Sequence, residues 1–247
     1  MSVIGTAWRA DKYQSGDLMK NKYILIGLLA VSSVVHAGRP IETDDASAAE
    51  MNTCQLDIWT EGARQTRQDN VNAGCNFFGQ GEFGLGFADL KGNDEDQSFQ
   101  SLGYKHIFRD FTDTTAGFGL AVSREWGRVE STSESSKETL ITAISTVPLG
   151  GADLLLHLNL GHVQFSDPFV SDSSIYKAAA LDYSYDERLG FSVETFSGVQ
   201  ESLSWRLGAR YTFIPDFLQI DASYGSDYGT FTDSRVFTIG FGITPAF

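Results

Sequence analysis

The sequence predicts an all-β protein, a single transmembrane up-and-down antiparallel β-barrel of twelve strands. Three observations lead to this fold. Segments of about ten residues alternate apolar and polar side chains, the connections between them differ in length, and the chain stops at Phe247 directly after the last alternating segment. Strands that cross an outer membrane need this length and this period. Merging the least certain segment, or losing the first hairpin, would leave ten strands.

The chain begins with a leader, residues 1–37, that includes a secretory signal peptide. Lysines at positions 20 and 22 precede an apolar run over residues 23–35, and Ala37 ends a cleavage site of small residues. The run is shorter than the roughly 18 residues of a spanning helix. Because the residues before Met19 are polar, we expect translation to start at Met19 and cleavage to follow Ala37. Residues 38–52 would form a periplasmic segment, and residues 53–247 the barrel.

The exported part is strongly acidic. The whole chain has a formal net charge of −14, and the leader carries four basic and two acidic residues, so its removal leaves −16. Contacts with nucleic-acid phosphates need Lys and Arg, so this balance excludes nucleic acid as a partner. No segment after residue 37 is apolar for long enough to span a bilayer as a helix. A soluble secreted β-protein and a membrane barrel therefore remain.

Twelve segments after residue 52 carry the strand pattern. Alternation is clear in the tenth, where Leu203, Trp205 and Leu207 face one way and Arg206 and Arg210 face the other. The sixth alternates poorly. The expected strands are 53–61, 70–78, 81–89, 98–108, 113–125, 138–148, 153–164, 174–184, 187–197, 202–213, 217–226 and 235–244.

The connections between these segments favour a membrane barrel over a soluble sandwich. Connections after even-numbered segments are short, whereas those after odd-numbered segments are mostly longer and more polar. Outer-membrane barrels have short periplasmic turns and longer external loops. Aromatic residues also gather at segment ends, as interfacial girdles do: Phe108, Phe111, Trp126, Tyr183, Tyr185, Phe213 and Phe217.

The end of the chain indicates how the barrel would be inserted. Phe241 and Ile243 precede the terminal Phe247, and together they resemble the β-signal that the barrel assembly machinery reads. We therefore expect that machinery and the lipids and lipopolysaccharide of a Gram-negative outer membrane as partners. Both termini would face the periplasm.

The two cysteines lie near the outer ends of the first predicted hairpin. If Cys54 pairs directly with Cys75, Leu56 falls opposite Ala73 and all outward positions stay in register. The periplasm is oxidising, so we predict a structural disulfide. A catalytic thiol would need a nearby His or Lys, and the sequence places none there.

Charged side chains are predicted on the inward face. Two interpretations remain open: an ion-pair network that plugs a narrow barrel, or a constriction that selects solutes by charge. In either case Arg206 and Arg210 need carboxylate partners, because a buried guanidinium stays charged. The candidate lumen residues are Arg206, Arg210, Asp221, Glu194, Asp182, Asp57, Glu82 and His157, with Glu61 and Glu125 on the same face.

Enzymatic and metal-dependent functions find little support. His162 is predicted to face outward, where some outer-membrane barrels carry a lipid-hydrolysing Ser–His pair, but no G-x-S-x-G motif lies nearby. His157 and His162 are five residues apart and point to opposite faces, so they cannot share a metal. We expect no enzyme activity, no metal and no cofactor. The acidic external loops would be a solvated rim, or would bind divalent cations that bridge to lipopolysaccharide phosphates.

The segment from Arg39 through Cys75 resembles the amino-terminal signature of a family of proteobacterial outer-membrane proteins. The matching residues are Arg39-Pro40-x-x-Thr43-Asp44-Asp45-Ala46, Cys54-Gln55-Leu56 with Trp59, and Cys75-Asn76. This family is similar to proteins assigned as transporters in phenol meta-cleavage pathways. The resemblance implies a small barrel that moves small, aromatic or hydrophobic solutes.

Three functions follow as hypotheses. The first is a passive channel or transporter for small solutes. The second is a closed structural or surface barrel with a plugged lumen. The third is a lipid-modifying barrel enzyme, which a close outward-facing Ser–His pair would indicate.

Overall fold

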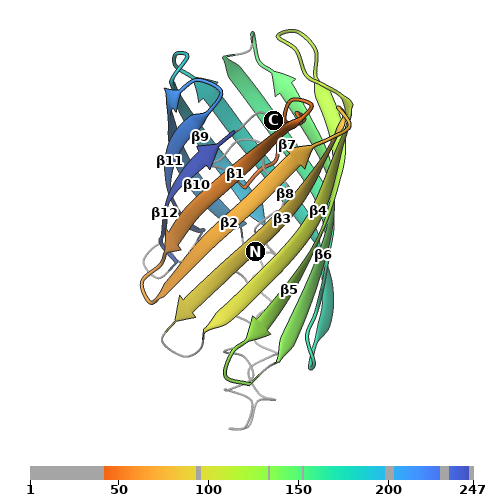
Figure 1. The fold of residues 1–247 in the computed structure, drawn as a ribbon, viewed down its shortest axis with the longest axis vertical. Coiled ribbons are helices and arrows are strands. Elements are labelled where there is room, and N and C mark those ends of the chain that lie inside the picture. Colours follow the sequence, from red (N-terminus) through yellow and green to blue (C-terminus); the bar gives the residue numbers. More distant parts are fainter. Residues whose placement is uncertain are drawn as a thin grey trace, which may run out of the picture. The chain divides into compact units, whose positions relative to one another are not determined.

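The computed structural model describes residues 42–92, 96–132, 134–151, 153–197, 203–228 and 234–244. Its strands form one closed antiparallel barrel in which each strand pairs with its neighbours in sequence and β12 pairs with β1 (Figure 1). The predicted all-β, twelve-stranded barrel is therefore confirmed. The leader with its expected start and cleavage sites, and Phe247 of the expected assembly signal, lie outside the described residues. Within the described ranges, no helix is long and apolar enough to cross a membrane.

Each predicted segment corresponds to one strand, with ends that differ by a few residues. The strands are β1 (Thr53–Gly62), β2 (Thr66–Asn76), β3 (Gly81–Gly92), β4 (Gln97–Arg109), β5 (Gly117–Val129), β6 (Ser135–Pro148), β7 (Leu154–Ser166), β8 (Ser171–Ser184), β9 (Leu189–Ser197), β10 (Leu203–Ile214), β11 (Leu218–Asp227) and β12 (Val236–Ile243).

The prediction that connections after odd-numbered strands are longer than those after even-numbered strands is wrong. Odd-numbered strands lead into connections such as 63–65 and 130–134, and even-numbered strands into comparable ones such as 110–116 and 149–153. We call these two ends of the barrel the loop end and the turn end. At the loop end the strands continue through residues expected to be loop. β6 begins at Ser135, but its first exposed outward apolar residue is Ile141. The outward residues of this extension are polar, so apolar alternation alone did not reveal it.

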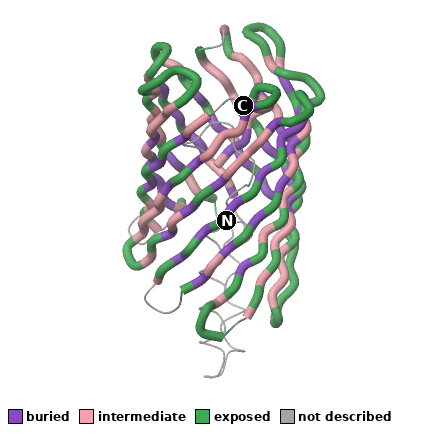
Figure 2. The backbone as a smooth tube through the Cα atoms, in the orientation of Figure 1, coloured by how far each residue is buried: buried purple, intermediate pink, exposed green. Residues whose placement is uncertain are grey.

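The outer surface of the barrel is apolar over a continuous band. Along most strands buried residues alternate with exposed or half-buried ones, as Figure 2 shows, and many of the exposed members are large hydrophobic side chains. Phe87 and Leu160 are 57% and 60% exposed, respectively. Soluble proteins do not expose contiguous apolar surface on this scale, so the band contacts lipid. Its outward residues include Leu85, Leu120, Leu158, Leu207, Phe237, Ile239 and Phe241.

Aromatic rings form a row on the outside near the turn end. Phe83 and Tyr104 lie with ring centroids 4.7 Å apart, and His106 and Phe108 with centroids 5.0 Å apart. The guanidinium of Arg109 lies 4.6 Å above the Phe118 ring. Amphipathic and aromatic side chains in this position match a membrane-interface girdle.

The disulfide between Cys54 and Cys75 is confirmed. The S–S distance is 2.07 Å, and the two residues are direct partners in the β1–β2 ladder. Leu56 lies opposite Ala73, as the sequence register requires. The bond links the two strands at the turn end, where the chain enters β1.

Candidate functional site

Residues 42–50, which we call the plug segment, lie inside the barrel. This corrects the expectation that residues 38–52 form a periplasmic segment; residues 38–41 are outside the described residues. The plug segment begins beside Glu194 of β9 and ends at the turn end, where the Glu50 carbonyl accepts a hydrogen bond from the Thr53 amide. A barrel of twelve strands has a diameter of about 24 Å between opposite backbones, which is more than the side chains of the wall readily fill. An inserted stretch of chain fills that space, and lumen side chains satisfy its backbone amides.

Glu194 anchors the first residues of the plug segment. Its carboxylate accepts hydrogen bonds from the Glu42 amide at 2.9 Å and from the Thr43 amide at 3.0 Å. The Thr43 hydroxyl donates to the same carboxylate at 2.9 Å. Glu194 is almost fully buried, so these donors replace the water that the carboxylate has lost.

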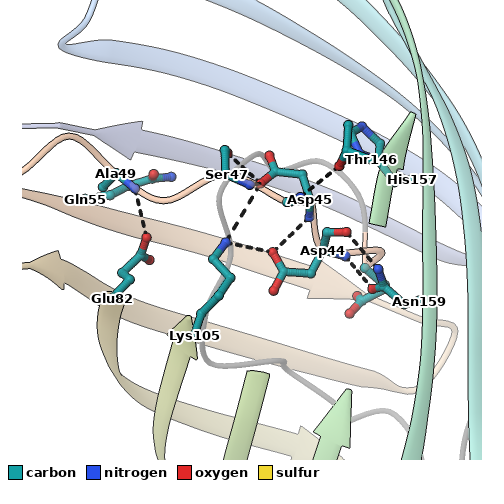
Figure 3. A network of polar contacts seen from close by, with 12 residues as sticks. Asp44, Asp45, Ser47, Ala49, Gln55, Glu82, Lys105, Thr146, His157 and Asn159 are labelled. Carbon is teal, nitrogen blue, oxygen red and sulfur yellow. Dashed lines mark hydrogen bonds and ion pairs between the residues drawn. The ribbon is translucent and has the colours of Figure 1, made fainter. Parts of the chain in front are cut away.

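Further wall side chains bind the backbone of the plug segment (Figure 3). The Asp44 amide donates to Asn159 Oδ1 at 2.7 Å, and Asn159 Nδ2 donates back to the Asp44 carbonyl at 2.8 Å. The Ala46 amide donates to the Thr146 hydroxyl at 2.8 Å, which in turn lies 2.9 Å from His157 Nδ1. These contacts hold an irregular segment without any strand pairing.

Glu82 binds the other end of the segment by accepting a hydrogen bond from the Ala49 amide at 3.1 Å. The Glu82 side chain lies across Gly74, where a Cβ would come within 2.5 Å of its carboxylate oxygen. The glycine thus allows the carboxylate to lie against the wall. Asn76 completes this end, because its Nδ2 donates to the Ala49 carbonyl at 2.6 Å.

Lys105 of β4 forms the central ion pair. Its Nζ lies 3.0 Å from Asp44 Oδ1 and 3.8 Å from Asp45 Oδ1, and its side chain is fully buried (Figure 3). Burial raises the pKa of the Asp44 carboxyl, while the Lys105 ammonium acts in the opposite direction. Lys105 was not among the lumen residues expected from the sequence. Parity would have found it, since Leu102, Tyr104 and His106 on the same strand face outward.

Arg206 and Arg210 both have carboxylate partners of the kind expected. Arg206 Nη1 lies 2.7 Å from Glu42 Oε1 of the plug segment, and its Nε lies 3.9 Å from Glu194. Arg210 of β10 forms an ion pair with Asp182 of β8. Its guanidinium occupies the space that a side chain at Gly190 would fill.

The structure divides the expected lumen residues into three groups. Glu82, Glu194, Arg206 and His157 contact the plug segment directly or through Thr146. Arg210 and Asp182 form a pair within the wall. Asp57 of β1 and Asp221 of β11 are buried on either side of β12, opposite Gly242 and Gly240, respectively.

Several charged or polar side chains on the inward face are buried. Inward side chains that would line a water-filled pore are buried: His157, Glu194 and Asp221 are each 2% exposed and Asp57 is 4% exposed. These four side chains come from β7, β9, β11 and β1, so burial of inward charged groups extends around the wall.

An apolar cluster lines the inner wall between β6 and β9. Leu140, Val163, Tyr176 and Ala178 are buried together, with Phe196 packed against them. The Tyr176 hydroxyl donates to the Glu42 carbonyl at 3.5 Å, so this cluster adjoins the first residue of the plug segment. The lumen is thus not uniformly polar.

The two histidines of β7 point to opposite faces, as predicted. His157 is buried inward and His162 faces outward. Ile141 and Ile175 lie opposite His162 on the flanking strands, so no serine faces it directly across either ladder.

A closed barrel with an apolar exterior and a charged lumen is the architecture of Gram-negative outer-membrane proteins, and this protein belongs to that class and that membrane. Residues 25–245 match the family described as Uncharacterised conserved protein UCP029691, and the chain belongs to this family. A search of curated proteins finds no match.

Several solved barrels are similar in fold. The COG4313 outer membrane channel from Pseudomonas putida F1 has a TM-score of 0.62 at 12% sequence identity, covering 85% of this chain and 100% of that chain. The KdgM porin has a TM-score of 0.59 at 9% identity, covering 76% and 98%, respectively. The translocator domain of autotransporter NalP from Neisseria meningitidis has a TM-score of 0.51 at 13% identity, covering 92% and 96%. At these identities the likeness concerns the fold alone.

Proposed function

We propose that the protein is an outer-membrane channel for small solutes, and that the plug segment closes it in the state described. One observation carries this proposal. The barrel closes through β1–β12 pairing, so the plug segment contributes no strand to the wall. It is held instead by wall side chains such as Glu194, Asn159 and Lys105. The segment can therefore leave without exposing a sheet edge.

The charges of the lumen support a preference for cations once the segment has left. Inward carboxylates outnumber the inward cations Lys105, Arg206 and Arg210. Rings and rows of carboxylates favour cations in pores. The carboxylates are Asp57, Glu61, Glu82, Asp182, Glu194 and Asp221.

Two features favour solutes with aromatic or apolar character. The apolar cluster around Tyr176 and Phe196 lies on the inner wall beside the plug segment. In addition, Thr43-Asp44-Asp45-Ala46, which carry the resemblance to transporters of phenol pathways, are residues of the plug segment itself. Similar folds include proteins named as a channel and a porin.

A closed structural barrel is the second candidate. The burial of the lumen charges favours it. The hydrogen bonds of the plug segment favour it as well, because the backbone amides of Thr43, Asp44 and Ala46 already donate to side chains of the wall. In this case the plug segment would be a permanent filling of the barrel.

Planar-bilayer conductance separates the two candidates. We would compare refolded mature protein, residues 38–247, with a variant that lacks residues 38–49. A channel should show low or intermittent conductance when intact and steady conductance, at least tenfold higher on average, without the segment. Heat-modifiable electrophoretic mobility would show that both proteins fold. If the folded deletion variant stays closed, the channel proposal is wrong and the structural barrel stands.

Solute preference can be measured on the same two proteins by liposome swelling. The deletion variant should admit benzylammonium faster than benzoate, because the open lumen is acidic. It should also admit benzylammonium faster than an aliphatic ammonium of similar size if the apolar cluster contributes. Equal rates for benzylammonium and the aliphatic ammonium would contradict the proposed preference for aromatic solutes.

A further inference from the structure

The wall of the lumen binds the plug segment largely through its main chain. Asn159 contacts both polar groups of one residue, because its Oδ1 accepts from the Asp44 amide at 2.7 Å and its Nδ2 donates to the Asp44 carbonyl at 2.8 Å. Glu194 accepts the two preceding amides, those of Glu42 and Thr43. Every residue except proline carries this donor and this acceptor. The wall therefore presents a site for peptide chain that leaves most side chains of the ligand unspecified.

The wall groups that accept these amides follow one another from the turn end into the barrel. Glu82, which binds the Ala49 amide, is the second residue of β3. Thr146, which binds the Ala46 amide, lies two residues before the end of β6. Glu194 lies five residues into β9. Figure 3 shows Glu82 at one side of this row and Thr146 at the other. We call the row of Glu82, Thr146, Asn159 and Glu194 the amide track.

Two side chains of the plug segment make charged contacts with the wall. Lys105 Nζ lies 3.0 Å from Asp44 Oδ1, and Arg206 Nη1 lies 2.7 Å from Glu42 Oε1. A peptide that uses both cations needs two carboxylate side chains with one residue between them. These carboxylates would replace those of Glu42 and Asp44 one for one, so the charge around Lys105 and Arg206 would stay balanced although the rest of the lumen is acidic.

The residue that follows these carboxylates most closely fitted to the wall is small. Ala46 is fully buried, and Ser, Ala and Ala occupy positions 47–49. Protein interiors are close-packed, so a large side chain at the position of Ala46 would overlap its neighbours. A peptide ligand therefore needs a small residue two positions after its second carboxylate.

We propose that the amide track is a peptide-binding site, that the plug segment occupies it as an internal ligand, and that the solutes of the channel include short acidic peptides that compete with the segment. The inference rests on the proposed function in one respect, which is that the segment leaves the lumen. A tethered segment has an effective concentration of roughly millimolar order, so free peptide must reach that range to compete.

The experiment measures where a free peptide binds in the full chain purified from outer membranes. The probe is acetyl-Glu-Ala-Asp-Ala-Ala amide extended by one residue that carries a photoreactive diazirine, supplied at about 1 mM. After irradiation, mass spectrometry locates the cross-links, which we expect on the inward faces of β4, β6 and β7. Asp44→Asn weakens the segment and leaves the wall intact, so it should raise the yield about fivefold or more. Glu50→Gln removes an exposed carboxylate of the same segment and should leave the yield unchanged.

Two altered probes test what the wall recognises. A probe with lysine in place of both acids loses the contacts with Lys105 and Arg206. A probe methylated on the aspartate nitrogen keeps its charge but loses the donor to Asn159. Each should lower the yield in the Asp44→Asn variant about fivefold or more. Equal yields from all three probes would overturn the proposal, because they would indicate unspecific trapping.

Amide exchange over residues 42–50 of the Asp44→Asn variant separates this proposal from the proposed function. Slow exchange would mean that the segment stays docked, which contradicts both. Faster exchange without inward cross-links would mean that the segment leaves but the wall binds no peptide, and only the peptide proposal would be wrong. Heat-modifiable mobility shows whether the variant is folded. If it is not, Thr43→Val serves instead, because it removes one hydrogen bond between the segment and Glu194.

Discussion

The two arginines of β10 are four residues apart and share the inward face, but they occupy different surroundings. Arg206 pairs with Glu42 of the plug segment and lies near Glu61 and Glu194. Among the described residues, the partners of Arg210 are wall groups: the Asp182 carboxylate and the Ser184 hydroxyl, the latter at 3.4 Å. One guanidinium therefore links the wall to the inserted segment, and the other links the wall to itself. If the segment moves, the charge balance changes around Arg206 and stays the same around Arg210.

Lys105 belongs with Arg206 in this comparison, since its partners Asp44 and Asp45 are both in the plug segment. Lys105→Met keeps the length of the side chain but leaves buried carboxylates without their cation, which costs about 3–5 kcal/mol. We expect the segment to undock, so amide exchange over residues 42–50 accelerates and conductance rises toward that of the deletion variant.

The control for Lys105 is Lys177→Met, which removes an exposed, outward-facing lysine of β8. It should leave both exchange and conductance unchanged. Full protection of residues 42–50 in the Lys105 variant would mean that the ion pair does not hold the segment.

Removing the disulfide should act on the wall without distinguishing the two arginines. Cys54→Ser with Cys75→Ser opens a covalent loop with twenty intervening residues, and we expect the barrel to lose about 3 kcal/mol of stability. Thermal unfolding measures the loss, with single-channel conductance recorded alongside. Conductance should stay at the wild-type level, and a rise would show that the clamped hairpin also holds the segment.

Direct comparison of Arg206→Gln with Arg210→Gln tests the distinction itself. Arg206→Gln removes a charged hydrogen bond to Glu42, worth about 1.5–3 kcal/mol, so the open probability should rise about tenfold or more. Arg210→Gln should leave it unchanged. In the barrel without residues 38–49, replacing both with Ala should shift the reversal potential toward cations. Equal effects of the two single variants on the open probability would show that Arg206 and Arg210 do not differ in how they hold the plug segment.

The smallest effect is expected at Thr146, whose hydroxyl accepts a hydrogen bond from the Ala46 amide. Thr146→Val should weaken docking of the segment by about 1 kcal/mol, visible as roughly fivefold faster exchange at Ala46. Thr142→Val is the matched control, because Thr142 is also inward on β6 and its hydroxyl has no hydrogen-bond partner within the described part of the chain. Similar acceleration in both variants would indicate a general loosening of β6.

Much of the wall could be predicted because a transmembrane strand repeats its environment every second residue. Twelve segments, the register of Cys54 and Cys75, and the inward direction of Arg206 and Arg210 all follow from that period. The strand extensions at the loop end escaped prediction, because polar side chains on both faces leave no alternation to detect. The direction of Lys105 follows from the same period, but its partners Asp44 and Asp45 belong to a segment without any periodicity.

The sequence by itself determined which residues face lipid and which face the lumen, since that division is local and periodic. Only the tertiary structure decided what fills the lumen. The plug segment has no periodicity, and its run of Glu42 to Asp45 reads as solvated chain until Glu194, Asn159 and Lys105 are brought around it from three distant strands. Closure of the ring places these side chains at one level, and a barrel of twelve strands is wide enough to admit the segment they bind.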